Sequence, residues 1–431
     1  KKLVTKKNYK IIFFLDCGTN SHSSIKFLKE QKIDTIIIDH HNVNKPYPIS
    51  NIFINPKKET TYDKYNYLCS SYLTYLFIDL YFNIYKIKSS LKNKLIYVLL
   101  ATVSDIMPIR GLNRLLAISV LREFDLNKEF IFEKIFKKLN ISKKLEIDDL
   151  GFIIGPILNS AGRINNANQV VKLLISKSNE EKEIILEKLF NFNKKRKDIE
   201  QKILNDIDLN EIEKKDGIIV IYLPNISEGL IGIIASKIKD YFNKPCIVLT
   251  NSLNIIKGSA RSTSEFNIGN YIYIALKKKI LISGGGHNLA AGISLNKDNI
   301  NLFENFLNVF YKNKSQQISN FYLSKISLNY LNKKFIKDLN IIGPFGHKNS
   351  NPIFLIENVK LVNPTILKNR FISCFIKNNT KMIKAISFNQ LKSRVSYEIL
   401  NSIYNQSIKE MRIIEPKDFF YVKDTLLKRD R

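Results

Sequence analysis

The chain has 431 residues, with 68 Lys and Arg against 39 Asp and Glu, which gives a net charge of +29 at pH 7. At roughly 100–200 residues per domain, this length predicts two to four domains. With 45% hydrophobic residues, 16 Gly and 11 Pro, the composition excludes disordered and collagen-like classes. The charge has two interpretations. It indicates a polyanion partner, either nucleic acid or an acidic membrane, or it reflects the Lys, Ile and Asn bias of an AT-rich genome.

The four cysteines are scattered and form no CxxC pair, so the sequence indicates neither a zinc ribbon nor a disulfide framework. We therefore expect a reducing, cytoplasmic location. The most apolar long stretch, residues 68–85, contains Asp79 and Asn83 and predicts a buried helix rather than a membrane span. Because the first residue is Lys1 and not Met, we expect a fragment that lacks its true start.

The first segment alternates strand and helix signals. Residues 11–15 form a short apolar run, residues 24–31 are typical of a helix, and residues 35–38 are β-branched. Strand, helix and strand within about 30 residues predict a βαβ unit with a parallel strand pair. Since functional groups gather at the carboxyl ends of such strands, Asp16 and the triplet 39–41 should meet at one edge.

The middle of the chain is predicted to be helical over residues 65–176, with one helix ending at Ser104-Asp105. A long charged amphipathic stretch, 178–208, follows a capping-box pair at Ser178 and Glu181 and predicts a connecting helix.

A second α/β pattern then begins at Gly217. It predicts a strand at 218–223, a helix at 229–241 and a strand at 246–250. We predict loops or turns at 257–262 and 284–295, where small residues dominate. Short strands at 352–362, 370–376 and 382–388 predict a small β-barrel or sandwich.

One group of residues has metal-ligand chemistry: Asp16, Asp39, His40, His41 and Asp105. Two of the five histidines of the chain stand together after Asp39 at a predicted strand end. Carboxylate oxygens with imidazole nitrogen suit Mn²⁺ or Mg²⁺ better than a thiolate site would. The alternative interpretation is an ordinary polar turn.

Three further segments favour anion binding. Glycines 284–286 before His287 would let backbone N–H groups approach a phosphate, although a plain hairpin or helix cap explains them equally well. The segment 257–262 places Lys257 and Arg261 among hydroxyls. Residues 155–163 predict a small-residue loop with one Arg, whose planar fork suits phosphate. Each pattern alone is weak.

Taken together, these motifs resemble the RecJ family of single-strand-specific 5′→3′ DNA exonucleases, within the DHH phosphoesterase superfamily. The similarity extends from about residue 11 to 355 in nine ordered blocks: FFLDCGTNSH, IIIDHHNV, INP, LLATVSDIMPI, GPILNSAGRI, EGLIGIIASKI, KGSARS, GGGHNLAAGIS and GPFGHKNSNPIF. The blocks GPILNSAGR and GGGHNLAAGIS, joined to a DHH domain, separate RecJ from the pyrophosphatases and small-nucleotide phosphodiesterases of the superfamily.

The resemblance implies an α/β fold in several parts. These are a parallel-sheet DHH domain at 1–177 that lacks its first strands, a connecting helix at 178–210, a smaller α/β DHH-associated domain at 211–312, and a C-terminal β-barrel of the OB-fold type at 325–431. Such a barrel binds single strands by stacking and a basic groove, with Phe371, Phe375 and Tyr397 as candidates.

The resemblance also implies the roles of individual residues around two divalent ions, Mn²⁺ or Mg²⁺. Asp16, His40 and Asp105 look like metal ligands, Asp39 like the carboxylate that orients a histidine, and His41 like the group facing the scissile phosphate. The chemistry would be in-line attack by metal-bound hydroxide. The substrate contacts would be Arg163, Asn159, Ser259, Arg261, Ser262, Gly285, Gly286 and His287.

Two departures from the family pattern stand out. The first family motif, DxDxxG, is absent from the 431 residues, so we expect the chain as given to be inactive or nearly so. Residues 226–228 are Ile-Ser-Glu where the family usually has Trp-His before the glycine, which puts one substrate contact in doubt.

The family function is degradation of single-stranded DNA to mononucleotides in repair and recombination, by a monomer with a single-strand-binding protein and a helicase as partners. Two alternatives stay open. One is a DHH phosphodiesterase for oligoribonucleotides or cyclic dinucleotides. The other is a non-catalytic single-strand-binding scaffold.

Overall fold

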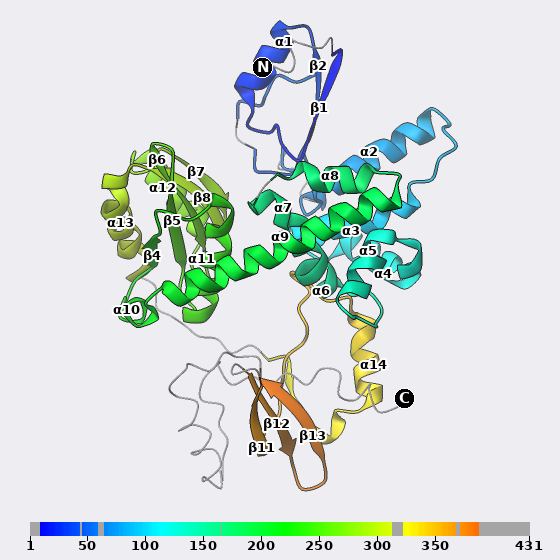
Figure 1. Cartoon of the computed structure of the whole chain (residues 1–431), viewed down its shortest axis with the longest axis vertical. Helices are drawn as coiled ribbons and strands as arrows, with labels where there is room; N and C mark the ends of the chain where they lie inside the picture. Colours follow the sequence, from blue (N-terminus) through cyan, green and yellow to red (C-terminus); the bar gives the residue numbers. More distant parts are fainter. Residues whose placement is uncertain are drawn as a thin grey trace. The chain divides into compact units, whose positions relative to one another are not determined.

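A computed structural model describes residues 9–43, 45–58, 64–164, 166–312, 322–367 and 371–387 (Figure 1). The chain divides into two compact units. Unit 1 contains the residues up to 156 together with 337–351, and unit 2 contains 157–336 and the residues from 352 onward. Each unit is described by itself.

Unit 1 is built on a parallel sheet in the order β1 (Ile11–Leu15), β2 (Asp34–Ile38), β3 (Ile52–Ile54). Helix α1 (His22–Glu30) connects β1 to β2, which confirms the predicted βαβ unit. The central strand β2 is buried in four of its five residues, because parallel strands are covered on both faces. The edge strand β1 alternates between half-buried and exposed side chains.

The rest of unit 1 is mainly helical, with α2 (Ser70–Ile84), α3 (Leu95–Ser104), α4 (Gly111–Glu123), α5 (Phe130–Lys138), α6 (Ile147–Asp149), the π-helical turn Leu150–Ile154 and the end of α14 (Lys333–Ile342). The prediction of a buried helix at 68–85 is confirmed for its first half and wrong for its second half. Helix α2 buries Tyr72 and Leu73, whereas Leu80 and Ile84 are 59% and 63% exposed. The helix contacts β1 and β2, and its Phe77 meets Phe13 of β1 edge to face.

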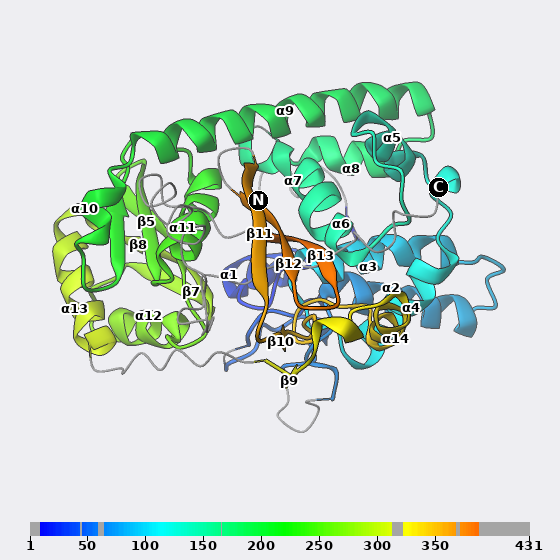
Figure 2. The same ribbon diagram turned by 90° about the horizontal axis from the view of Figure 1, so that it is seen from below.

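Unit 2 contains a three-layer α/β/α arrangement around a five-stranded sheet. The strand order is β4 (Ile219–Tyr222), β5 (Cys246–Ser252), β6 (Ile255–Arg261), β8 (Ala290–Leu295), β7 (Ser283–His287), with only the β4–β5 pair parallel. Helix α11 (Glu228–Phe242) covers one face. Helices α12 (Ile268–Lys277) and α13 (Ile300–Lys312) cover the other, as Figure 2 shows.

The predicted loops at 257–262 and 284–295 are wrong, because these segments are strands β6, β7 and β8. Their small residues are explained by close packing between strands and not by turn formation. A Cβ on Gly258 would lie 2.5 Å from Leu249 Cδ2 and 2.7 Å from Ile293 Cγ1, in the neighbouring strands. Glycine inside a strand often marks such a close approach.

The predicted loop at 155–163 is also wrong, because these residues form helix α7 (Gly155–Ile164). Pro156, which has no N–H to donate, stands directly after the π-helical turn Leu150–Ile154, from which α7 continues. Ser160 is fully buried and donates to the Leu189 carbonyl at 3.1 Å, so its small size fits tight packing against α9 (Asn179–Asp206).

Helix α9 confirms the long helix predicted after residue 178. It contains 28 residues, and the Ser178 hydroxyl caps it by accepting from the Glu181 N–H. At 1.5 Å per residue it is about 42 Å long. The shorter helices α8 (Asn168–Ile175) and α10 (Leu209–Glu213) precede and follow it.

The C-terminal part begins with a two-stranded parallel pair, β9 (Ser324–Lys325) and β10 (Phe354–Leu355). Strands β11 (Lys360–Leu367), β12 (Phe371–Lys377) and β13 (Met382–Ser387) form an antiparallel sheet over a core that includes Leu328 and Cys374. Within the described residues this sheet is open and does not close into the predicted barrel. Tyr397 and the side chain of Phe371 lie outside the described residues, so their predicted stacking role stays a prediction.

Among the described helices, none is long and apolar enough to cross a bilayer. The four cysteines are free: Cys69, Cys246 and Cys374 are buried, and Cys17 is exposed.

Candidate metal centre and anion pocket

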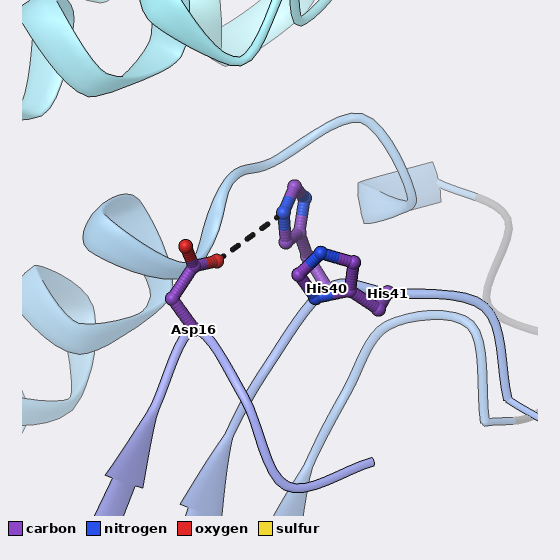
Figure 3. Close-up of side chains that lie close together, drawn as sticks. All are labelled: Asp16, His40 and His41. Carbon is purple, nitrogen blue, oxygen red and sulfur yellow. Dashed lines mark ion pairs between the residues drawn. The ribbon is translucent and has the colours of Figure 1, made fainter. Parts of the chain in front are cut away.

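The strand ends of unit 1 bring a carboxylate and an imidazole face to face. Asp16 directly follows β1 and adopts a left-handed backbone conformation with φ of 61°, which aspartate tolerates better than most residues. His40 lies two residues after β2. The distance from Asp16 Oδ1 to His40 Nε2 is 3.4 Å, and Figure 3 shows the two side chains pointing toward each other.

A second carboxylate comes from the helical part of unit 1. Asp105 is the C-cap residue of α3, and its Oδ2 lies 3.9 Å from His40 Nε2. The nitrogen and oxygen atoms that Asp16, His40 and His41 offer all lie within 4.8 Å of one another. The structure therefore brings together the residues that the sequence pattern grouped, while their roles stay predictions.

The distances of 3.4 and 3.9 Å from His40 Nε2 to the carboxylates of Asp16 and Asp105 fit a hard divalent cation. In an octahedral Mg²⁺ site with bonds of about 2.1 Å, neighbouring ligand atoms lie about 3 Å apart and opposite ones about 4 Å apart. The charges fit as well. A hydrogen bond with His40 lowers the pKa of Asp16, whereas burial and the nearby Asp16 charge raise the pKa of Asp105. Crowded carboxylates of this kind are relieved by a cation.

The carboxylate of Asp39 contacts both histidines. Its carboxylate is buried and accepts from the N–H groups of Thr19 at 3.1 Å and His40 at 2.8 Å, and it lies 2.7 Å from His41 Nδ1. Burial raises the pKa of Asp39, but the hydrogen bonds from Thr19 and His41 outweigh it and bring the pKa down to about 2. An ionised carboxylate at this position fixes the ring orientation of His41.

Asn55 links the three strand-end loops and was not singled out from the sequence. This buried amide, just after β3, donates at 3.0 Å both to the Thr19 hydroxyl and to the His41 carbonyl. The only sequence signal was its place in the block INP, because a hydrogen bond over 36 residues leaves no local pattern.

Unit 2 contains a pocket that is lined by several of the residues predicted to contact an anion. It has a volume of about 450 Å³ and is lined by Arg163, Lys257, Ser259 and Arg261 together with the start of α11. Lys257, Ser259 and Arg261 share one face of β6 because side chains alternate along a strand, and the intervening Ala260 is buried on the other face.

Two glycines of α11, one helical turn apart, make room for this pocket. A Cβ on Gly229 would lie 2.5 Å from the Arg163 carbonyl oxygen, and one on Gly232 would lie 3.0 Å from Arg261 Nη2 and from Ser259 Oγ. The guanidinium of Arg163 donates to the Gly229 carbonyl at 3.1 Å. The i, i+3 spacing of the glycines was the overlooked sequence signal.

The pocket has a net positive charge. Glu228 Oε2 pairs with Lys257 Nζ at 2.8 Å, which leaves Arg163 and Arg261 without a carboxylate at ion-pair distance among the described residues. Burial lowers the pKa of both guanidinium groups, and the charge of Arg163 lowers that of Arg261 further. Two crowded guanidinium groups favour binding of a multiply charged anion.

The remaining predicted substrate contacts lie apart from the lining of this pocket. Asn159 is exposed on α7, one turn before Arg163. Ser262 is buried and donates its hydroxyl proton to the Phe266 carbonyl, so it closes a turn. Gly285, Gly286 and His287 are exposed at the β7–β8 hairpin.

Three family models match the chain in succession. The DHH family N-terminal domain matches residues 1–103, the DHHA1 domain residues 215–313, and the RecJ OB domain residues 324–412. The part that matches the DHH family thus contains the parallel sheet with its carboxylate and histidine cluster. With the two further domains in this order, the chain is similar in its domain organisation to the RecJ family.

Several relatives share this similarity. The chain is 26% identical over 400 residues to the single-stranded-DNA-specific exonuclease RecJ of Bacillus subtilis, covering 90% of this chain and 50% of the relative. It is 28% identical over 315 residues to the Escherichia coli RecJ exonuclease, covering 68% and 55%. A crystal structure of Thermus thermophilus RecJ in complex with Mn²⁺ matches the fold with a TM-score of 0.77 at 19% identity, covering 89% and 57%. The chain thus spans about half the length of these relatives.

Proposed function

We propose that the chain acts as a divalent-metal-dependent exonuclease that degrades single-stranded DNA from its 5′ end to mononucleotides, in DNA repair and recombination. The carrying observation is the carboxylate and imidazole cluster of Asp16, His40 and Asp105 in a chain with the RecJ domain order. The printed names of the relatives, which are single-stranded-DNA-specific exonucleases, support the substrate.

In this proposal Asp16, His40 and Asp105 hold the divalent ions, Mn²⁺ or Mg²⁺. Bound ions of this kind lower the pKa of water and stabilise charge on phosphate oxygens. Asp39 keeps His41 oriented toward the reacting phosphate through the contact of 2.7 Å at Nδ1. The phosphate backbone of the DNA would bind lysine-rich surfaces of the chain. Such binding would account for the net charge of +29.

The pocket of unit 2 would take a terminal phosphate. A 5′-phosphate monoester carries close to two negative charges near pH 7, whereas an internal phosphodiester carries one. The two guanidinium groups of Arg163 and Arg261 match the monoester in charge. We also keep Asn159, Ser262, Gly285, Gly286 and His287 as proposed contacts with the rest of the strand.

Direct measurement of Mn²⁺ binding tests the metal centre. Titration calorimetry should detect Mn²⁺ binding to the wild-type chain, and Asp16→Asn should weaken it by roughly 10- to 100-fold. Asp79→Asn is the matched control, because Asp79 lies on α2 and contacts only Asn83 among the contacts described for it. Equal weakening by both variants would contradict the assignment of Asp16.

Nuclease assays with Mn²⁺ test the substrate. We expect slow degradation of a long 5′-phosphorylated single strand, because DxDxxG is absent from the 431 residues. Faster cleavage of a dinucleotide than of the long strand would favour the phosphodiesterase alternative. Salt-dependent binding of the strand without any cleavage, by a chain that also carries DxDxxG, would favour the scaffold alternative.

The remaining expectations belong to the same proposal. They are the domain bounds at 1–177, 178–210, 211–312 and 325–431, a cytoplasmic monomer, and a single-strand-binding protein and a helicase as partners. Size-exclusion chromatography with light scattering checks the monomer.

A further inference from the structure

A segment late in the sequence packs within unit 1 onto the loop that follows α3 and begins with Asp105. We call residues 342–349 the strap. The strap belongs to unit 1, although the residues on either side of 337–351 belong to unit 2. Its His347 carbonyl accepts from the Ile109 N–H at 2.8 Å. Arg114 Nη2 donates to the carbonyls of Ile342 at 3.2 Å and Gly343 at 2.8 Å.

The strap closes on itself in a tight turn that leaves no spare room. Gly346 and Asn349 exchange backbone hydrogen bonds of 2.9 and 3.0 Å, and the Asn349 amide donates to the Pro344 carbonyl at 2.9 Å. A Cβ on Gly346 would lie 2.7 Å from Ile109 Cγ1, and Ile109 is only 2% exposed. The turn therefore fits over Ile109 only because residue 346 is glycine.

Ile109 lies four residues after Asp105, in the short loop that joins α3 to α4. At the α3 end, Asp105 N–H donates to the Ala101 carbonyl, and the next residue, Ile106, has a left-handed φ of 54°. At the other end, the strap binds Ile109, and Asn113 donates to the Pro108 carbonyl at 3.0 Å. The loop is thus fixed from both sides, and a shift of Ile109 would move the chain next to Asp105.

We propose that the strap is a positioning element for Asp105: by holding Ile109 and Arg114 it fixes the loop on which that carboxylate stands. This inference rests on the proposed function in one respect: the expected change in Mn²⁺ affinity requires the metal centre proposed above. It assigns a role to the block GPFGHKN, which the metal centre and the anion pocket leave unexplained. It also makes metal affinity depend on a segment more than 200 residues away in sequence.

Two variants of the full chain test the strap. Arg114→Met removes both hydrogen bonds to the strap carbonyls without adding bulk, and Gly346→Ala forces Ile109 aside. The matched control is Gly162→Ala, where the new Cβ would meet only Ala167 Cβ, at 3.5 Å. Each variant is measured for Mn²⁺ affinity by calorimetry, for amide hydrogen exchange in residues 105–110, and for binding of a 5′-phosphorylated oligonucleotide.

We expect Arg114→Met and Gly346→Ala to weaken Mn²⁺ binding by roughly 10-fold, as loss of supporting contacts around ligands does. Exchange at residues 105–110 should accelerate, and oligonucleotide binding at low metal should stay within about twofold because it depends on unit 2. Gly162→Ala should change none of these. A general loss of folding in Gly346→Ala would weaken both kinds of binding and accelerate exchange throughout the chain, and Arg114→Met then decides the matter.

Wild-type Mn²⁺ affinity in Arg114→Met, with accelerated exchange, would overturn the proposal, because the loop would then be loose without consequence for Asp105. If the wild-type chain itself bound no Mn²⁺, the proposed function would fail separately. Amide hydrogen exchange would still test the role of the strap. Faster exchange at residues 105 and 106 in Arg114→Met would support the proposal, and unchanged exchange there would overturn it.

Discussion

Arg261→Met should separate binding from stability in the anion pocket. Arg261 lies beside Arg163, and burial together with this neighbouring charge lowers its pKa, so the two guanidinium groups repel each other in the free protein. Removing Arg261 relieves that repulsion but takes away its donation to the Ala260 carbonyl at 2.8 Å. These effects have opposite signs, so we expect the melting temperature to be unchanged or slightly higher.

Binding should respond much more strongly. A hydrogen bond to a charged group contributes about 1.5–3 kcal/mol, and every 1.4 kcal/mol is about tenfold in affinity. Loss of the Arg261 contact should therefore weaken binding of a 5′-phosphorylated oligonucleotide by roughly 10- to 150-fold. Fluorescence anisotropy at fixed salt measures this, with a 5′-hydroxyl oligonucleotide of the same sequence beside it.

The 5′-hydroxyl strand should lose much less affinity. The control variant is Lys172→Met, which removes one positive charge at an exposed position of α8 outside the pocket lining. Equal losses for both oligonucleotides, or a loss no larger than that of Lys172→Met, would refute the reasoning that the pocket recognises a terminal phosphate.

Three further substitutions test other parts of the two sites. Asp39→Asn should lower the free energy of unfolding by about 2 kcal/mol at pH 7, because the pKa of Asp39 falls from 3.8 to about 2 on folding. A lowered carboxyl pKa stabilises above its unfolded value, so urea unfolding should show the difference shrinking between about pH 4 and pH 2. Asn55→Ala should cost about 1–3 kcal/mol, since it leaves the buried Thr19 hydroxyl without its donor; thermal denaturation measures the loss. Gly229→Ala should cost about 1–3 kcal/mol and weaken phosphate binding, because its Cβ would overlap the Arg163 backbone.

Each of these three predictions has either a control variant or an outcome that would contradict it. Gly162→Ala serves for Gly229→Ala, and we expect it to stabilise the helix slightly, since alanine is the better helix former. A pH-independent loss in Asp39→Asn would mean that the carboxylate is not the stabilising form. A melting temperature unaffected by Asn55→Ala would show that the strand-end loops hold their places without this amide.

The first strands and the metal cluster could be predicted from sequence for a physical reason. Short apolar runs at 11–15 and 35–38, with a helix between them, predict a parallel strand pair, and the carboxyl ends of such strands share an edge. That placed Asp16 beside His40 without any knowledge of distance. Asp105 was grouped with them as a carboxylate at a predicted helix end, but its role as a ligand came only from the family resemblance, because the sequence does not specify how α3 packs against the sheet.

The small-residue segments could not be predicted in this way. Glycine and serine favour turns by local preference, so β6, β7, β8 and α7 were all predicted as loops. Their conformation is decided instead by neighbours distant in sequence, as at Gly258 between Leu249 and Ile293. The same limit applies to Asn55 and to the strap, whose contacts extend over 36 and 228 residues.

The distribution of the cysteines gives the chain a natural labelling site. Cys69, Cys246 and Cys374 are sealed in hydrophobic interiors, and burial raises the pKa of each thiol, whereas Cys17 is exposed directly after Asp16. Because the reactive species is the thiolate, a maleimide dye applied to the folded chain should attach at Cys17. Burial and the charges of Asp39 and Asp16 raise the Cys17 pKa, so labelling should be slow at neutral pH and faster in mild alkali. A fluorophore one residue from a proposed metal ligand would then report on ion binding optically, without engineering a new attachment point.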